Sequence, residues 1–388
     1  MRIAVIVRSL KIGGMERVAV NLSESFAEAG HESHLIYFKD RGRVFTPNKS
    51  VHFHHFNLDK ILRLTIVGAI LGLFAKIFST IFRGSFFLYN GTLLAPIFKY
   101  QLKKLEKEYG EFELIIIRGH GTFELIWPYK DDRVVQMVES VFIRNGSWLD
   151  KLYINCVYSG KNLAGVSSGV KERIVEVLKE SKVEAKSVQV IHNSIDIGLI
   201  NQKAKEYKPQ IDEKYILSLG RVTPNKNLSF LLESYKYARD KLNLDLPLVI
   251  VGDGHDMSNI KIKIESLELK PYVKLEGLVK NPYPWILNAS LLTSTSKAEG
   301  FGMVLLEALA SHTKIISTKS KGGVKDIMVG ELEEYMVDFS IEKFAKKMVE
   351  ILNKKNSFDF ECYTKEFLPS VIVEKYMTLY PPQQKRVH

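Results

Sequence analysis

Short apolar runs alternate with amphipathic stretches along both halves of the chain. In the first half this pattern predicts strands over residues 2–7, 33–38, 114–117, 133–138 and 162–167. In the second half it predicts strands over residues 215–219, 247–251, 273–276, 290–293 and 314–317. Strands that alternate with helices are typical of parallel sheets. The pattern therefore predicts an α/β protein with a parallel sheet in each half.

The length of the chain also favours two domains. A chain of 388 residues is too long for one ordinary core and suits two domains of about 150–200 residues each. The polar stretch 196–212 follows the VQVIHN segment and is the predicted joint. We therefore expect an N-terminal domain over 1–195 and a second domain over 196–363, followed by a helix and a disordered tail over 364–388.

The run EGFGMVLLE places two carboxylates, Glu299 and Glu307, around a glycine-containing turn that leads into an apolar helix. Gly300 and Gly302 let the backbone approach a ligand closely. The start of the helix offers N–H groups and a positive dipole end to a phosphate. Glu299 is then a candidate acceptor for sugar hydroxyls, and Glu307 for a ribose diol. The alternative is a loop and an amphipathic helix with two surface glutamates.

A second group of candidate residues lies in the segment YILSLGRVTPNKN, residues 215–227. It reads as a buried strand, a Gly-Arg turn and the start of a helix. Arg221 and Lys226 therefore flank a loop at the end of a parallel strand, where open α/β sheets bind ligands. Two cations there suit a diphosphate. A solvated basic loop is the alternative.

Together these segments resemble the family 4 retaining glycosyltransferases of GT-B fold. Further matches extend along most of the chain: RIAVIV with SLKIGGMERVAVNLSESFAEAGHE (2–32), VIHNSID (190–196), VIVGDG (249–254) and KGGVKDIM (321–328). The resemblance implies two Rossmann-like domains that face each other across a central cleft. It also implies that the last helix crosses back onto the N-terminal domain.

The resemblance assigns roles to individual residues. Arg221 and Lys226 would bind the donor diphosphate and stabilise the departing nucleotide, Glu299 would contact the donor sugar, and Glu307 the ribose. The remaining donor-binding positions contribute backbone: they are Gly13, Gly14, Phe301, Gly302 and Met303. Fixed cations stabilise the charge of a leaving diphosphate, so the chemistry of the residues agrees with these roles.

The chain departs from the family pattern on the acceptor side. Where many members carry a histidine after the strand at 133–138, this chain has Glu139, a candidate hydrogen-bond acceptor or base. His120, after the strand at 114–117, is the other candidate, and an ordinary strand-end residue is the alternative for both. The usual Asn-Gly is Asn193-Ser194 here, and the Gly-x-Pro after the second glutamate is replaced within residues 311–314.

No metal or other cofactor is expected besides the nucleotide-sugar donor. No D-x-D triplet occurs in the chain, so a metal-independent reaction is predicted. The VHFHHF run could suggest a metal site, but strand alternation sends His52 and His54 to one face and His55 to the other. No carboxylate or cysteine lies close in sequence. With two cysteines and no signal-peptide pattern, we expect a cytoplasmic protein.

Residues 60–105 contain seven basic residues and no acidic one, among abundant Leu, Ile and Phe. On a helix through 64–83, one stripe is small or polar and the rest is almost all apolar; the stripe comprises Thr65, Gly68, Gly72, Lys76, Ser79 and Arg83. This pattern predicts a helix that lies in the surface of an anionic membrane. A buried core helix is one alternative. A spanning helix is another, disfavoured by Lys76 at its centre.

The net charge of +11 also favours anionic lipid or phosphorylated acceptors, because no nucleic-acid-binding motif accompanies it. We therefore expect an enzyme that moves a hexose or N-acetylhexosamine, with retention, from a UDP-linked donor. The expected acceptor is a lipid-anchored saccharide of lipopolysaccharide or another surface glycan, at the inner face of a bacterial membrane. Two alternatives are a UDP-sugar epimerase of the same fold and a catalytically silent membrane-associated subunit.

Overall fold

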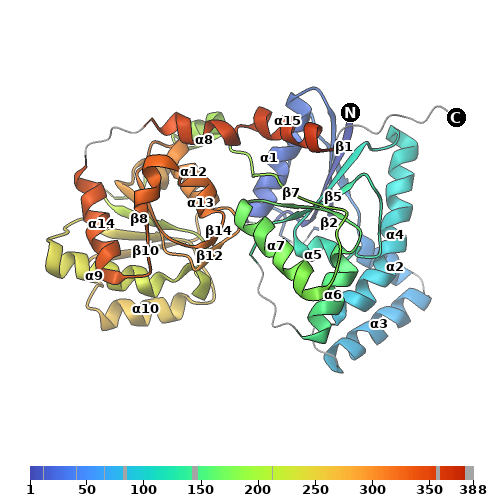
Figure 1. Cartoon of the computed structure of the whole chain (residues 1–388), viewed down its shortest axis with the longest axis horizontal. Helices are drawn as coiled ribbons and strands as arrows, with labels where there is room; N and C mark the ends of the chain where they lie inside the picture. Colours follow the sequence, from blue (N-terminus) through green and yellow to red (C-terminus); the bar gives the residue numbers. More distant parts are fainter. Residues whose placement is uncertain are drawn as a thin grey trace. The chain divides into compact units, whose positions relative to one another are not determined.

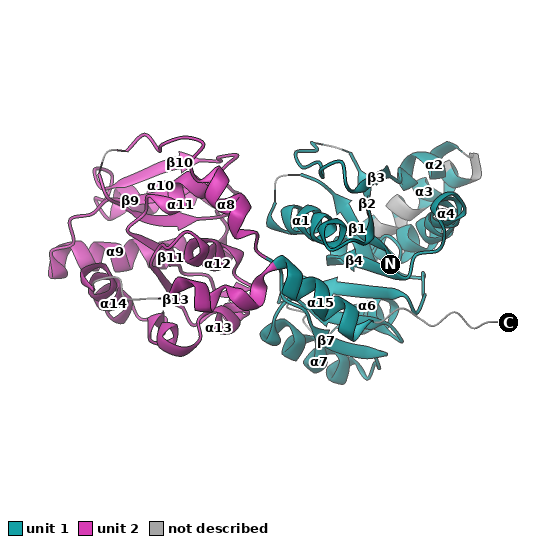
Figure 2. Ribbon diagram, turned by 90° about the horizontal axis from the view of Figure 1, so that it is seen from above, with its two compact units in different colours: residues 1–194, 369–388 teal, residues 195–368 magenta. Residues whose placement is uncertain are grey.

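The computed structural model describes residues 1–11, 13–40, 42–64, 66–81, 85–141, 147–211, 213–354 and 359–380 (Figure 1). The chain divides into two compact units (Figure 2). Unit 1 comprises Met1–Ser194 together with the chain from Pro369 onward, and unit 2 comprises Ile195–Leu368. The sequence analysis placed these divisions after residues 195 and 363.

Unit 1 is built on a parallel sheet with the strand order β3-β2-β1-β4-β5-β6-β7. The strands are β1 (Arg2–Ser9), β2 (Glu32–Lys39), β3 (His52–His55), β4 (Leu114–Arg118), β5 (Val134–Val138), β6 (Asn162–Gly165) and β7 (Ser187–Val190). The five strands predicted in this half are all present. Their apolar runs are buried on both faces, which is why β4 and β5 lack the alternation of a half-exposed strand.

Helices join these strands and pack on the sheet. They are α1 (Gly14–Glu28), α2 (Leu58–Leu64), α3 (Ile66–Ile81), α4 (Phe86–Tyr109), α5 (His120–Phe123), α6 (Trp148–Tyr158), α7 (Ser168–Ser181) and α15 (Pro369–Leu379). Although α15 follows unit 2 in the sequence, it packs on α1, where the rings of Phe26 and Tyr376 meet edge to face at 5.6 Å. The predicted C-terminal helix therefore completes unit 1.

The basic, apolar segment 60–105 forms the helices α2, α3 and α4, and α3 is the helix predicted through 64–83. Gly68 is buried, and Gly72 faces Leu62 of α2, so the small residues of the stripe point inward. Thr65 and Arg83 lie outside the described residues, as do the side chains of Lys76 and Ser79. No helix in the described part of the chain is long and apolar enough to span a membrane.

Unit 2 repeats the architecture, with the strand order β10-β9-β8-β11-β13-β15 and parallel pairing throughout. Its strands are β8 (Ile216–Leu219), β9 (Leu248–Val251), β10 (Val273–Gly277), β11 (Leu291–Ser294), β13 (Ile315–Thr318) and β15 (Met336–Val337). A separate two-stranded ladder pairs β12 (Ala298–Glu299) with β14 (Lys321–Gly322). The five strands predicted in this half form the main sheet, and β15 extends it.

The helices of unit 2 precede, connect and follow these strands in the sequence. They are α8 (Ile197–Lys203), α9 (Leu228–Leu242), α10 (Met257–Ser266), α11 (Tyr283–Leu287), α12 (Met303–Ala310), α13 (Val324–Ile327) and α14 (Ile341–Asn353), with 3-10 turns η1 (Pro224–Lys226), η2 (Gly330–Tyr335), η3 (Phe360–Tyr363) and η4 (Lys365–Phe367). The stretch expected to be a polar joint contains α8. Its N-terminus is capped by Asp196, whose Oδ1 accepts from the N–H of Leu199 at 2.9 Å.

Each sheet has a point where the strand order reverses. In unit 1, β1 lies between β2 and β4, and in unit 2, β8 lies between β9 and β11. Ligands of open parallel sheets bind outside the carboxyl ends of the strands at such a point. The predicted site residues follow these strands: Gly13 and His120 come after β1 and β4, and Arg221 and Glu299 after β8 and β11.

Candidate active site

The loop after β8 is held in place by two close backbone approaches. The N–H of Val222 donates to the carbonyl of Asp253 at 2.9 Å, so this loop packs against the loop after β9. A Cβ at Gly252 would lie 1.9 Å from the carbonyl oxygen of Gly220, and one at Gly254 would lie 2.0 Å from that of Val222. The VIVGDG motif therefore needs its glycines because the two loops leave no room for side chains.

This loop presents the two predicted phosphate ligands. Arg221 is exposed directly beyond β8, and Lys226 ends the turn η1. Asn227 then takes the left-handed conformation (φ 52°), which turns the chain into α9. Of the two cations, Lys226 has a fixed partner: its Nζ lies 2.5 Å from Oε1 of Glu299. The structure thus brings together two residues that are far apart in sequence.

Hydrogen bonds fix the loop of Lys226 to the segment that carries Glu299. Asn225 Nδ2 donates to the carbonyl of Ala298 at 2.8 Å, and the N–H of Lys297 donates to the carbonyl of Asn225 at 2.8 Å. Thr295 Oγ1 donates to the carbonyl of Lys226 at 2.9 Å. The lysine and the carboxylate are therefore positioned by their backbones as well as by their own ion pair.

Glu299 is itself oriented from a second side. Ser296 Oγ donates to Oε1 of Glu299 at 2.6 Å, so both this bond and the ion pair with Lys226 use the same oxygen. The described residues provide no hydrogen bond to Oε2, which points to it as the acceptor for a ligand hydroxyl. The backbone of Glu299 is held as well, because the N–H of Gly323 donates to its carbonyl at 3.0 Å.

The helix α12 begins beside this carboxylate. Gly302 precedes it in the left-handed region (φ 103°) and provides no side-chain cap. The N–H groups of Met303 and Val304 have no acceptor within the helix, as in the first turn of any helix. The ring of Phe301 is buried against Phe367 at 5.3 Å, so this residue offers a ligand its backbone only.

Glu307 lies further along α12 and is largely enclosed. Glu307 is 7% exposed. The hydroxyl of Tyr283 donates a hydrogen bond to Oε1 of Glu307 at 3.4 Å. A buried carboxylate needs hydrogen-bond donors to remain stable.

In unit 1, the predicted glycines lie between β1 and α1. Gly13 is extended (φ 180°), and a Cβ there would lie 2.2 Å from Oε2 of Glu16, while Gly14 is open. Nearby at the carboxyl end of β4, a Cβ at Gly119 would lie 2.5 Å from Sδ of Met15. The side chains of Glu16 and Met15 therefore fill the space beside Gly13 and Gly119, and Gly14 is left open.

Glu139 belongs to a buried network that the sequence analysis did not predict. Arg118, at the end of β4, is 1% exposed, and its Nη2 lies 2.6 Å from Oε1 of Glu139. The same Nη2 donates to Oδ1 of Asn193 at 2.6 Å. Burial raises the pKa of Glu139, and the guanidinium of Arg118 opposes that rise. In the sequence, the feature that could have indicated Arg118 is a charged residue at the end of an otherwise apolar strand.

The other acceptor-side candidate, His120, is the first residue of α5. Its Nε2 lies 2.6 Å from the hydroxyl oxygen of Tyr158, and its ring packs on Phe123. The two candidates thus lie at the carboxyl ends of the adjacent strands β4 and β5. Their partners differ: His120 contacts the hydroxyl of Tyr158, whereas Glu139 forms an ion pair with Arg118.

Two family models cover both halves of this arrangement. The model of "Glycosyltransferase Family 4" matches residues 12–199, and that of "Glycosyl transferases group 1" matches residues 200–362. The chain belongs to the family 4 glycosyltransferases. This glycosyltransferase is 24% identical to the N-acetylgalactosamine-N,N'-diacetylbacillosaminyl-diphospho-undecaprenol 4-alpha-N-acetylgalactosaminyltransferase of Campylobacter jejuni, over 84% of this chain and 83% of the relative.

Other relatives show the range of the family. The N-acetyl-alpha-D-glucosaminyl L-malate synthase of Bacillus anthracis is also 24% identical, over 82% of this chain and 78% of the relative. Among solved structures, S. aureus TarM, crystallised with UDP and alpha-GlcNAc-glycerol among its ligands, matches with a TM-score of 0.69 and 15% identity. That match covers 98% of this glycosyltransferase and 100% of the TarM chain. The glycosyltransferase therefore has the GT-B fold, with two Rossmann-like domains, as the sequence predicted.

Proposed function

We propose that this glycosyltransferase moves a hexose or N-acetylhexosamine from a UDP-linked donor to a lipid-anchored saccharide, with retention at the anomeric carbon and without a metal ion. The observation that carries the donor half of this proposal is the pairing of Lys226 with Glu299. Lys226 would bind a phosphate and Glu299 would accept a hydrogen bond from a sugar hydroxyl. Lys226 Nζ lies 2.5 Å from Oε1 of Glu299, which precedes the start of α12. TarM, of the same fold, was crystallised with UDP.

The chemistry follows from the charges at this edge of unit 2. When the bond between the sugar and the diphosphate breaks, negative charge grows on the leaving phosphate. Lys226, which Glu299 holds in place, and the exposed Arg221 stabilise that charge, and the first N–H groups of α12 add their partial charges. Glu299, held through Oε1, presents Oε2 to a sugar hydroxyl, which orients the sugar. These two cations perform the role for which other transferases use a metal.

A donor panel tests this part of the proposal. UDP-, GDP- and ADP-linked sugars are titrated into the protein, and thermal stabilisation and slow hydrolysis are recorded. We expect the UDP-sugars to give the largest stabilisation, unchanged by EDTA. Stabilisation by another nucleotide series, or activity that EDTA abolishes, would contradict the donor or the metal-independent reaction. The anomeric configuration of the product, read by proton NMR, tests retention.

The lipid-anchored acceptor is supported by the surface of α3. Its described apolar side chains point outward: Ile70, Leu73, Phe74 and Ile77 are each 47–60% exposed. Soluble surfaces rarely leave so many neighbouring apolar side chains in water. Exposed lysines and an arginine lie on α2 and α4, the two helices that contact α3: Lys60, Arg63, Lys99, Lys103 and Lys104. We call these nine residues the α3 surface.

The α3 surface has the composition of a membrane-binding surface. Apolar side chains enter the boundary between headgroups and acyl chains, while lysine and arginine attract anionic headgroups. A core helix would bury the side chains that α3 exposes. The name of the C. jejuni relative includes a saccharide linked to undecaprenol. This agrees with an acceptor that is located at a membrane. The B. anthracis relative, named for L-malate, represents the competing class of small soluble acceptors.

Vesicle sedimentation tests the membrane part. The protein should co-sediment with vesicles that contain anionic lipid, and much less with neutral ones, and salt should weaken the binding. Changing Leu73 and Phe74 to Gln should abolish most of it, whereas Ile262→Gln, which removes an equally exposed apolar residue of unit 2, should not. Equal binding by all three proteins would contradict the assignment.

Assays with and without acceptor separate the alternatives. An epimerase interconverts UDP-sugars without an acceptor, and a silent subunit neither hydrolyses nor transfers the sugar. The geometry favours a transferase over a silent subunit because Arg221, Lys226 and Glu299 are all present and the last two are in contact.

A further inference from the structure

A group of imidazoles and one carboxylate lies at the end of the unit 1 sheet that is opposite to the candidate active-site residues. His34 of β2 and His52 of β3 are register partners on neighbouring parallel strands, and Glu32 precedes them at the start of β2. These positions are near the amino ends of β2 and β3. The candidate active-site residues of unit 1 instead follow the carboxyl ends of the strands. This group therefore has no place in the proposed sugar transfer.

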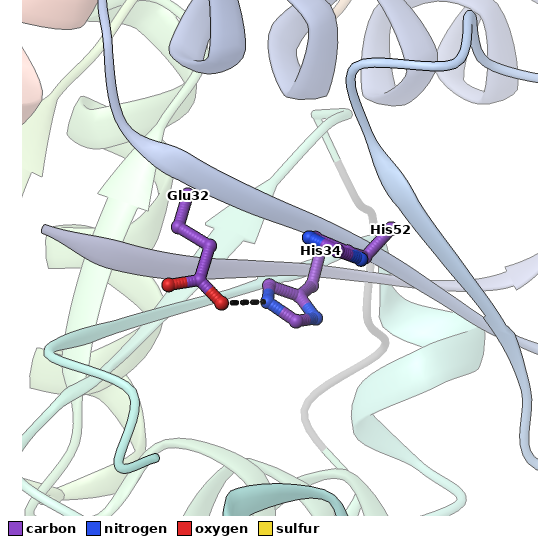
Figure 3. Close-up of side chains that lie close together, drawn as sticks. All are labelled: Glu32, His34 and His52. Atoms are coloured by element: carbon purple, nitrogen blue, oxygen red, sulfur yellow. Dashed lines mark hydrogen bonds and ion pairs between the residues drawn. The ribbon is translucent and has the colours of Figure 1, made fainter. Parts of the chain in front are cut away.

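The three side chains are already close enough to share one ion. Glu32, His34 and His52 each offer a ligand atom, and these atoms all lie within 4.8 Å of one another. His34 Nε2 lies 3.3 Å from Oε1 of Glu32, as the dashed line in Figure 3 marks, with the ring of His52 beside it on the next strand. Ligands of a tetrahedral zinc ion with bonds of about 2.0–2.1 Å are roughly 3.3 Å apart.

The remaining distance can be closed by the side chains that are accessible. His34 is fully buried, while His52 is exposed and the Glu32 side chain is 34% exposed. A rotation of His52 and a small shift of Glu32 would bring their atoms to bonding distance of an ion on His34. The fixed ligand is thus the buried one, and the adjustable ligands face solvent, from which an ion arrives.

Two further contacts support the ligands from behind. His34 Nδ1 lies 3.0 Å from His54 Nε2, so the second ring nitrogen of His34 has a partner when the first binds an ion. The other oxygen of Glu32, Oε2, is held by Arg2 Nη2 at 2.6 Å. Outer partners of this kind fix the tautomer and orientation of metal ligands. His34 is also wedged edge-on between Tyr109 and Phe112, at 5.0 and 4.9 Å.

We propose that Glu32, His34 and His52 form a binding site for a borderline divalent metal ion such as Zn²⁺, which joins the edge strand β3 to β2. His34 Nε2, His52 and a Glu32 oxygen are the protein ligands, and water completes the coordination. In the bound form, His34 Nδ1–H donates to His54. Two imidazoles and one carboxylate are a ligand set that Zn²⁺ takes in proteins.

The neutral state of the imidazole supports this assignment. Burial lowers the pKa of His34 to about 4, and burial likewise lowers the pKa of His54. His34 therefore needs to lose no proton to bind a metal ion at neutral pH. The Glu32 carboxylate is ionised under the same conditions, since the hydrogen bond from Arg2 lowers its pKa.

Calorimetric titration of Zn²⁺ into the full chain, with no affinity tag and after removal of metal by EDTA, tests the site. We expect one equivalent to bind and the melting temperature to rise. His52→Gln and Glu32→Gln should each weaken binding at least 10-fold. His55→Gln is the matched control, because His55 is on the opposite face of β3, stacked on Tyr37, and should leave the affinity unchanged.

Two outcomes would overturn the proposal. One is the absence of binding, and the other is equal affinity for the unchanged protein and the His52→Gln variant. Metal-free melts of each variant show whether it folds. Co²⁺ serves as a spectroscopic probe: the intense visible bands of a four-coordinate ion should appear with the unchanged protein and with His55→Gln but not with His52→Gln. Nitrogen-15 NMR of the imidazoles should show Nε2 of His34 coordinated and Nδ1 protonated.

Discussion

Lys226 has two tasks in the proposed reaction, because the amine that would bind the phosphate also holds Glu299. We predict that Lys226→Ala and Arg221→Ala each lower turnover by roughly 100-fold or more, the effect of losing one preorganised charge contact, about 2.7 kcal/mol. Steady-state assay of sugar transfer measures this. Lys236→Ala is the control, since Lys236 forms an exposed pair with Asp240 on α9 and should have no effect. Near-normal turnover of Lys226→Ala would show that it does not bind the diphosphate.

The two glutamates of the E-x7-E run should separate in their effects. Glu299 lies beside the lysine, and Glu307 is enclosed near Tyr283. We predict that Glu299→Gln impairs transfer but leaves the affinity for free UDP nearly unchanged. Glu307→Gln should weaken UDP itself. Calorimetric titration with UDP measures both, and equal losses of UDP affinity would remove the distinction between a sugar ligand and a ribose ligand.

The buried imidazole of His34 should make folding pH-dependent. Its folded pKa of about 4 lies below the ordinary value of 6.5, so the unfolded chain binds more protons between these values. Stability should be complete above pH 6.5 and fall as the pH drops toward 4, by about 1–3 kcal/mol. Urea denaturation in EDTA at several pH values measures the loss. The free energy of unfolding of His34→Leu should depend less on pH over the same range. If it depended on pH as steeply as that of the unchanged protein, another group would cause the effect.

Residues in short motifs could be predicted from sequence, and residues joined only by the fold could not. Lys226 and Glu299 each belong to a recognisable segment, although their contact needed the strand order β8-β11. Arg118 and Glu32 were missed for one reason. Glu139 directly follows β5, the neighbour of the strand that ends at Arg118, and His52 is on β3, the neighbour of the strand that carries Glu32 and His34. Strand register is not visible in composition.

At the scale of elements, the close approach of the β8 and β9 loops predicts an unusual sensitivity to a single methyl group. Gly252→Ala places Cβ 1.9 Å from the Gly220 carbonyl oxygen, at a φ of 137°. We expect it to destabilise unit 2 by roughly 2–5 kcal/mol, through overpacking and backbone strain together. Chemical denaturation measures this free energy of unfolding.

Gly277→Ala separates the two causes. Gly277 also has a positive φ, 72°, but no atom lies within 4 Å of an added Cβ. This variant should therefore show only the strain, about 1 kcal/mol. If both variants lost the same free energy, the contact between the loops would be unimportant for stability.

Elements with strong periodicity were predicted well, and elements that depend on tertiary pairing were not. The ten predicted strands are present, whereas β12, β14 and β15 have two residues each and carry no pattern of their own. The helix predicted through 64–83 is present as α3, but its packing against α2 was not predicted. The orientation of α3 depends on Gly72 packing against Leu62, a contact that periodicity alone cannot give.

For the whole molecule, the placement of α15 makes the C-terminus part of unit 1. We predict that truncation after Leu368 destabilises unit 1, because it removes Tyr376 from the ring of Phe26, while unit 2 keeps its stability. Hydrogen exchange should show faster exchange in β1 and α1 and unchanged exchange in β8 and β9. Truncation after Tyr380 is the control, since it leaves α15 intact. Equal protection in both truncated proteins would contradict the prediction.

The two-domain architecture could be predicted because each half repeats the same alternation of strand and helix. The details of the division could not. The expected polar joint contains α8, whose Ile200 is buried, and the expected helix over 364–380 is interrupted before Pro369, where η4 ends and α15 begins. A proline cannot continue a helix that precedes it, and it favours the first turn of the next one.

The return of α15 to unit 1 sets the order in which the protein can be made. Every strand and helix of unit 2 precedes α15 in the sequence, so all of unit 2 is synthesised before α15. The unit that begins the chain is different, because its α1 has no α15 to pack on until Tyr376 has left the ribosome. The N-terminal unit, although it begins the chain, is therefore completed only after all of unit 2 has been synthesised.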